Sequence, residues 1–237
     1  MSYEWVTLAG YWSDFVRASW LTLQITLLAF VLAMLLGLLT ALASASRVGL
    51  LRAIARVYIE AIRNTPVLLQ IFIVFFGLPS LGVTLNAYTA GVIALGVNVG
   101  AYLAEVFRAG IQSVPRGQLE AASILGLERS QIFVEVVLPQ ARAPSHAIVN
   151  NLIQLLLGTS LLSAIALPEL SGTATVINAR TLLYIQTFSI TLIAYLFLSN
   201  LLSWVASQIG VRVFHPPLVM KKRTRRWFLV ARQADRT

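Results

Sequence analysis

Residues 64–104 read NTPVLLQIFIVFFGLPSLGVTLNAYTAGVIALGVNVGAYLA and contain no Asp, Glu, Lys or Arg. A single helix over this run would be about 60 Å long, twice the ~30 Å thickness of the hydrocarbon core of a bilayer. The run therefore predicts two membrane-spanning helices that fold back on each other. Because proline and glycine interrupt helices, Pro79–Gly82 is the expected place of the reversal.

The composition of the whole chain supports a membrane location. Of its 237 residues, 58% are apolar and 11% are charged, whereas a soluble domain averages about 25% charged residues. The mean hydropathy is +0.80. We therefore expect an all-α integral membrane protein with five transmembrane helices, near residues 19–43, 57–79, 86–110, 144–167 and 182–210.

The distribution of basic residues predicts the orientation in the membrane. Counted before, between and after the five predicted spans, with Arg63 and Arg108 near the span ends included in the adjoining loops, Lys and Arg number 1, 4, 0, 4, 1 and 8. Cytoplasmic loops collect Lys and Arg. We therefore expect the N-terminus outside, the C-terminus inside, and the segment between the third and fourth spans in the cytoplasm.

This orientation divides the chain into three regions. Residues 1–18 are expected to form a periplasmic interfacial segment, because Trp and Tyr favour the membrane surface, although an ordinary ordered tail explains them equally well. Residues 19–211 form a single transmembrane domain. Residues 212–237 form a basic cytoplasmic tail, which serves as a positive-inside anchor or binds anionic lipid. The N-terminus lacks the features of a removable signal peptide.

Residues 117–139, inside the cytoplasmic segment 112–142, predict two short helices joined by a turn. Gly126 stands where a helix ends in the left-handed conformation, which glycine adopts without a Cβ clash. Glu128 opens the second helix, where a negative charge is favourable. Small exposed residues beside Glu120 would fit a groove on a cytoplasmic partner. The pattern predicts a cytoplasmic helix-turn-helix that another protein binds.

This segment resembles the EAA loop of bacterial ABC importer permeases. The matching residues are Glu120, Ala121, Ala122, Gly126 and Val136–Pro139, with Val136 where isoleucine is usual. Other stretches are similar to the polar amino acid permease subfamily: Arg63–Gln70, Phe76–Pro79, Ala101–Ile111 and Pro115–Gln118. The resemblance covers residues 20–210, and the subfamily also has five spans with the N-terminus outside.

The resemblance implies a permease subunit of an ATP-binding-cassette importer in the bacterial inner membrane, a transport subunit rather than an enzyme. It would pair with a second, identical or paralogous permease and receive a polar amino acid from a periplasmic binding protein. Two ATPase subunits would hold ATP and Mg, since this chain lacks a GxxxxGK[ST] phosphate loop and is expected to carry no cofactor or metal. The ATPase-coupling residues would be Glu120, Ala121, Ala122, Gly126, Leu138 and Pro139.

Polar residues within the predicted spans indicate where a solute passes. Transporter sites tend to lie where polar groups and interrupted helices meet near the midplane. We expect a substrate path lined by Asn98, Gln154, Gly158, Thr159 and Ser160. Hydrogen bonding between helices of the bundle explains the same residues equally well. Family members often have Lys-Asp where this chain has Leu157 and Gly158, which predicts neutral or acidic rather than cationic substrates.

Two charged pairs lie at the predicted cytoplasmic ends of spans two and three. Glu60 and Arg63 are three residues apart on one helix face, and so are Glu105 and Arg108. Charges beside membrane helices are costly and often functional. These residues would form a cytoplasmic gate or a brace toward the EAA loop. An interfacial pair that only fixes the depth of each helix is the alternative.

Other classes of membrane protein fit the sequence less well. A membrane-embedded enzyme would need convergent acids, histidines or a nucleophile, but there is no cysteine, and the two histidines lack zinc spacing. An ion channel would not require an EAA loop. The +9 net charge follows from the loops and the tail, so no nucleic acid partner is expected. An importer of the same type for another small polar solute, such as an opine, remains the alternative.

Overall fold

The computed structural model describes residues 2–128, 131–137 and 145–213, and all regular secondary structure in these ranges is helical. The α-helices are α1 (Ser2–Ala9), α2 (Trp12–Ala45), α3 (Gly49–Arg63), α4 (Val67–Phe72), α5 (Ala87–Gln112), α6 (Arg116–Ile124), α9 (Ser145–Gly158), α10 (Leu170–Thr181) and α11 (Tyr184–Val213). Two π-helical segments are η1 (Ile73–Gly77) and η3 (Ile132–Val137), and two 3-10 segments are η2 (Leu78–Leu81) and η4 (Thr159–Ile165). The predicted all-α class is confirmed for these residues.

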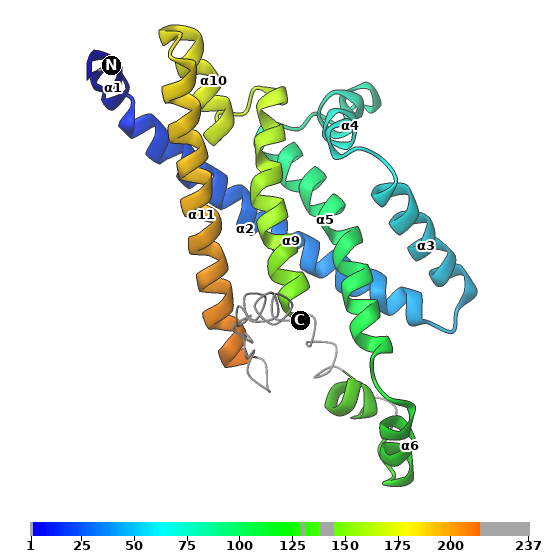
Figure 1. Ribbon diagram of the computed structural model, residues 1–237. Coiled ribbons are helices and arrows are strands. Elements are labelled where there is room, and N and C mark those ends of the chain that lie inside the picture. Colours follow the sequence, from blue (N-terminus) through cyan, green and yellow to red (C-terminus); the bar gives the residue numbers. More distant parts are fainter. Residues whose placement is uncertain (1, 129–130, 138–144, 214–237) are drawn as a thin grey trace, which may run out of the picture.

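Within the described residues, four helices are long and apolar enough to cross a membrane, namely Trp12–Ala45, Ala87–Gln112, His146–Ile165 and Tyr184–Gln208. They coincide with four of the five predicted spans, and the first extends beyond residues 19–43 at both ends. In Figure 1, α2 crosses α5, α9 and α11 obliquely, α6 projects from one end of the bundle, and α10 lies at the other. These are called the α6 end and the α10 end below.

The predicted span 57–79 is not one continuous helix. α3 ends at Arg63, and the helical run Val67–Leu81 is bent by 107° relative to it. Pro66 explains the break, because proline has no N–H to donate and disfavours helical backbone at the preceding Thr65. If the bent pair counts as one span, the described residues contain five candidate spans.

The reversal predicted at Pro79–Gly82 is confirmed. η2 ends at Leu81, and Gly82 has a φ of 84°, in the left-handed region that glycine adopts readily. Asn86 then caps α5, since its Oδ1 accepts a hydrogen bond from the backbone N–H of Thr89 at 2.8 Å. The chain thereby returns through the bundle as α5.

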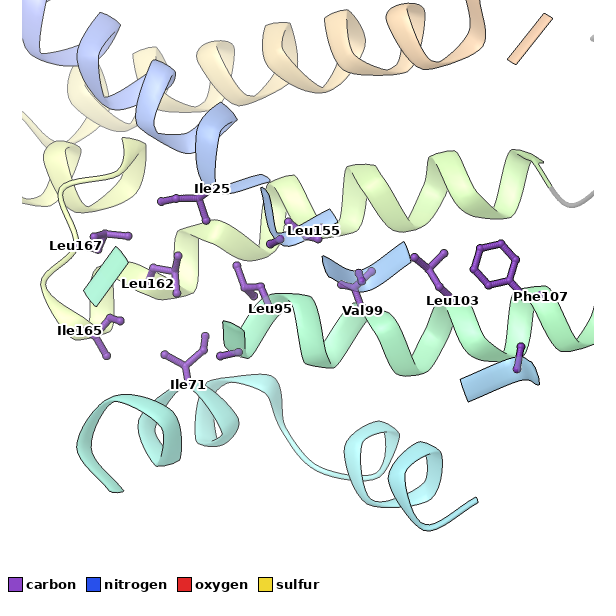
Figure 2. Packing of buried hydrophobic residues seen from close by; sticks show 14 residues of the cluster. Ile25, Ile71, Leu95, Val99, Leu103, Phe107, Leu155, Leu162, Ile165 and Leu167 are labelled. Carbon is purple, nitrogen blue, oxygen red and sulfur yellow. The ribbon is translucent and has the colours of Figure 1, made fainter. Parts of the chain in front are cut away.

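α2 and α5 pack closely at the centre of the fold. Ala29, Ala33 and Gly37 recur every four residues on the buried face of α2, a spacing of small residues that lets helix backbones approach. A row of α5 side chains packs into the same core (Figure 2). The row and its neighbours from α4 and α9 are Leu95, Val99, Leu103, Phe107, Ile71 and Leu155.

The predicted spans leave residues 168–181 as a connection, but the structure has α10 there. The fourth span continues from α9 into η4 and ends at Ala166, whose φ of 57° lies in the left-handed region. Glu169 then caps α10 by accepting hydrogen bonds from the backbone N–H groups of Ser171 and Gly172, at 3.0 and 2.7 Å. An acidic residue before a helix is favoured by the helix dipole, so Glu169 was the available signal for this helix.

We expect Gly37→Ala to loosen the α2–α5 contact. A Cβ at Gly37 would lie 2.8 Å from the Leu103 Cβ and 3.1 Å from the Ala104 backbone nitrogen. The overpacking should lower the free energy of unfolding by about 1–3 kcal/mol, measured by denaturant titration in detergent. Gly49→Ala is the matched control, since its Cβ would meet only the end of the Arg52 side chain, at 3.9 Å. Equal losses in the two variants would contradict the close packing.

Candidate functional site

A polar groove of about 530 Å³ opens between α4, α5 and α9. Four of the five residues predicted to line a substrate path border it, namely Asn98, Gln154, Gly158 and Ser160. Tyr102 and Asn151 add polar groups, and the apolar walls come from Val67, Leu95, Val99, Leu155, Leu157 and Leu161. Apolar walls with a few placed polar groups are typical of small-molecule sites.

Thr159, the fifth predicted path residue, does not border the groove. It is fully buried, and its hydroxyl donates to the Leu156 carbonyl at 2.6 Å. Gln154 behaves differently, since its side chain is exposed in the isolated chain and forms no hydrogen bond with any described residue. A polar side chain on a membrane helix is costly unless it is partnered. Gln154 therefore needs water, a solute or another protein surface to face it.

Gln70 links the broken second span to the groove, and sequence reasoning did not single it out. Its Nε2 donates to the Ile62 carbonyl at 2.9 Å and to Thr65 Oγ1 at 2.8 Å. Its Oε1 accepts a hydrogen bond from Asn98 Nδ2 at 2.9 Å. The Gln70 side chain thus donates a hydrogen bond to a backbone carbonyl that has no helical partner at the break. Its oxygen holds the Asn98 amide at the groove. The signal for this role in the sequence was an amide side chain placed shortly after the helix break at Asn64–Pro66.

The described side chains that border the groove carry no charge. Leu157 and Gly158, which occupy the positions of the usual Lys-Asp, both border it. An ammonium or guanidinium group placed there would find no carboxylate among these residues, and an unpaired charge away from water is costly. Through the side-chain amides of Asn98 and Gln154, the groove can donate hydrogen bonds to a neutral polar solute and accept hydrogen bonds from it.

The predicted Glu105–Arg108 pair is formed, whereas Arg63 of the predicted Glu60–Arg63 pair contacts Glu105 on α5 instead. Arg108 binds Glu105 through two nitrogens, at 2.9 and 2.6 Å. Arg63 lies 3.8 Å from the same carboxylate, and its guanidinium lies 5.3 Å from the centre of the Tyr102 ring. Within the described part of the chain, Glu60 forms no ion pair with Arg63. Glu105 therefore joins α3 to α5.

The predicted brace toward the EAA segment has no direct contact in the described residues. Arg108 reaches Gln112 Oε1 at 2.9 Å, still within α5, and no hydrogen bond or ion pair joins it to Glu120. Among these four charged residues, the Arg63–Glu105 ion pair therefore connects α3 to α5 at the α6 end. A gate or brace role for them stays a prediction.

α6 ends in the turn that the sequence predicts. Gly126 has a φ of 79°, its N–H donates to the Ser123 carbonyl at 3.1 Å, and the Leu127 N–H donates to the Ala122 carbonyl at 3.2 Å. This pattern is a Schellman motif. Beyond it, the Glu128 N–H donates to Gln131 Oε1 at 2.8 Å, as in a capping box.

The predicted coupling residues differ in exposure. Glu120 and Ala121 are exposed, whereas Ala122, expected at the exposed tip, is buried. The large apolar side chains of Ile124 and Leu125 are 86% and 79% exposed. Leu138 and Pro139 lie outside the described residues. α6 therefore presents an apolar and acidic surface that the isolated chain leaves uncovered.

A second buried polar cluster, also missed, holds the α10 end together. Tyr195 donates to Glu169 Oε2 at 2.8 Å, and the Leu170 N–H donates to Thr22 Oγ1 at 3.1 Å. Burial raises the pKa of the Glu169 carboxyl, while the hydrogen bonds that it accepts oppose the shift. The cluster joins α2, α10 and α11 by satisfied hydrogen bonds.

Comparison with known proteins identifies a consistent set of relatives. The model of the family described as "Binding-protein-dependent transport system inner membrane component" matches residues 33–214. The L-cystine transport system permease protein TcyB of Bacillus subtilis (strain 168) is 40% identical over 73% of this chain and 74% of its own length. The probable glutamine ABC transporter permease protein GlnP of the same organism is 34% identical over 89% and 97%.

A solved structure shares the fold. The crystal structure of an amino acid ABC transporter with histidines superposes with a TM-score of 0.81 at 34% sequence identity, covering 88% of this chain and 98% of that one. The shared fold thus extends over nearly the whole length of that transporter chain.

We expect Gln70→Leu to destabilise the bend between α3 and α4. It removes the donor to the Ile62 carbonyl and the acceptor for the Asn98 amide, both partly buried, and an unsatisfied polar group costs up to about 1–3 kcal/mol when buried. The thermal midpoint in detergent should fall measurably. Gln24→Leu is the control, because Gln24 is exposed on α2 without a hydrogen bond among the described residues. A midpoint for Gln70→Leu that matches this control would show that the network does not support the bend.

Proposed function

We propose that this chain, which belongs to the family of binding-protein-dependent transport system inner membrane components, is the permease subunit of an importer for small polar amino acids. The observation that carries the proposal is the polar groove, which brings four predicted path residues together on two membrane-spanning helices. The relatives named for amino-acid transport support the same substrate class.

The groove defines what the permease contributes to substrate recognition. Its amides at Asn98 and Gln154 suit the neutral polar groups of an amino acid, and the absence of charge among its described bordering residues disfavours a cationic side chain. The exposed Gln154 at the groove needs a polar partner within the bilayer. A second permease subunit that faces it would complete the path.

α6 is the proposed contact with the ATPase. Exposed Ile124 and Leu125 beside Glu120 form a short helical surface that fits a groove on a partner. The chain lacks a phosphate loop, so energy must come from a separate subunit. The charge distribution favours a cytoplasmic position for α6, with the N-terminus outside. A periplasmic binding protein would deliver the amino acid at the α10 end.

We expect Gly158→Asp to change the charge preference of the groove. The backbone at Gly158 is helical, with φ −64° and ψ −21°, and an added Cβ would meet only Leu95 Cδ2, at 3.7 Å. A carboxylate there can bind a cationic side chain through a charge-assisted hydrogen bond of about 1.5–3 kcal/mol. The variant should therefore bind arginine about 10- to 100-fold more tightly relative to glutamine.

The measurement is binding of labelled arginine and glutamine to the purified transporter without the binding protein, so that the permease alone is tested. Gly158→Asn is the control, because it adds the same volume without the charge. Wild-type preference for arginine over glutamine would contradict the proposed specificity. An unchanged ratio in Gly158→Asp would show that the groove is not the substrate path.

We expect Gly126→Val to uncouple transport from the ATPase. The left-handed φ of 79° strains a β-branched residue by about 1–2 kcal/mol, which should disturb the end of α6. Co-purification of the ATPase and amino-acid uptake should both fall, while insertion into the membrane stays normal. Gly117→Ala within α6 is the control, since its Cβ would have nothing within 4 Å. Full uptake by Gly126→Val would remove the proposed role of this turn.

A further inference from the structure

A cavity rich in arginine lies between α3 and the parts of α2 and α5 at the α6 end, and the transport function does not explain it. Its volume is about 360 Å³. The charged residues that line it are Arg52, Arg56, Arg63, Arg108, Glu60 and Glu105. Four guanidinium groups face two carboxylates, so the cavity has a net positive charge. It is called the basic cavity below.

The internal contacts leave part of this charge unneutralised. Arg63 and Arg108 share Glu105, whereas Arg52 donates to the carbonyls of Ser46 and Arg47, at 2.9 and 3.1 Å. Among the described residues, Arg56 has no hydrogen bond and no ion pair. The guanidinium of Arg56 is therefore free to bind an anion that enters the cavity.

The other side of α3 indicates the kind of anion. Leu50, Ile54 and Val57 recur on one face of the helix and are 69%, 58% and 66% exposed. In a membrane protein such a face lies against acyl chains, while the arginines of the same helix line the basic cavity. A molecule with a phosphate head and apolar chains matches both sides of α3. Basic pockets between membrane helices on the cytoplasmic side bind lipid headgroups in this way.

The size of the cavity is compatible with such a head. A water molecule takes up about 30 Å³ in the liquid, so 360 Å³ provides the space of about a dozen waters, enough for a phosphodiester group. Tyr58 keeps α3 close to α5, since its hydroxyl donates to the Val97 carbonyl at 2.7 Å. Arg52, Arg56 and Arg63 are thus presented by a helix that this hydrogen bond ties to α5.

We propose that the basic cavity binds the phosphate headgroup of an anionic phospholipid, with Arg56 as the principal ligand and the acyl chains along Leu50, Ile54 and Val57. The bound lipid would neutralise the arginine excess at the junction of α3 and α5. Glu60, which lines the same cavity, would oppose the phosphate and set the affinity. The site is distinct from the polar groove.

The test is lipid titration of the delipidated, detergent-purified full chain, followed by native mass spectrometry. Phosphatidylglycerol should bind at least about tenfold more tightly than phosphatidylcholine with the same chains. Arg56→Gln should weaken phosphatidylglycerol about fivefold, the effect of one basic residue beside an anionic surface. Arg47→Gln is the matched control, because it removes the same charge nearby but outside the cavity, and it should leave the affinity unchanged.

A second variant keeps the proposal testable if Arg56→Gln fails to fold. Glu60→Gln keeps every arginine and removes an opposing charge, so it should strengthen phosphatidylglycerol binding, whereas Glu120→Gln on α6 should not. Equal losses in Arg47→Gln and Arg56→Gln, or no gain in Glu60→Gln, would overturn the proposal. Competition by free glycerol phosphate at the concentrations of the lipid would also overturn it, because the cavity would then be a site for a soluble anion.

Discussion

Within a bilayer every backbone carbonyl needs a donor from the protein, and this requirement governs the meeting of α3 and α4. Pro66 interrupts the helix and leaves carbonyls open at the end of α3. Gln70 fills this need with its amide nitrogen and uses its oxygen to hold Asn98. One side chain thereby supports a bend of 107° and ties it to α5. The bend also shapes the polar groove, because Val67, directly after Pro66, borders it.

α5 joins the features that the proposed function requires. Asn98 borders the polar groove, Glu105 binds two arginines, and Gln112 ends the helix just before α6. The helix is continuous from its Asn86 cap and packs on α2 through small residues. Close-packed helices transmit displacement rather than absorb it. α5 therefore provides one continuous helix between the groove and the segment that leads into α6.

The sequence was sufficient wherever one chemical rule dominated. Charge-free runs located the spans, Pro79–Gly82 located the reversal, and Gly126 located the end of α6. It was insufficient where the packing of several helices together determines the structure. The span predicted at 57–79 is interrupted by a bend although Pro66 was visible in the sequence, because hydropathy does not reveal where an apolar segment bends. Thr159 shared the polarity of its neighbours, but helix rotation turned it away from the groove.

The two ends of the bundle are held by interactions of different strength. At the α10 end, Glu169 is buried and fully supplied with hydrogen bonds, and breaking such a network leaves a desolvated acid without partners. At the α6 end, Glu105 is partly exposed and shared by Arg63 and Arg108, and exposed ion pairs contribute only about 0–1 kcal/mol. Exchanging partners there costs little, and Glu60 lines the same cavity as an alternative acid. Relative movement of α3 and α5 is therefore easier at the α6 end, where the proposed ATPase contact lies, than at the α10 end.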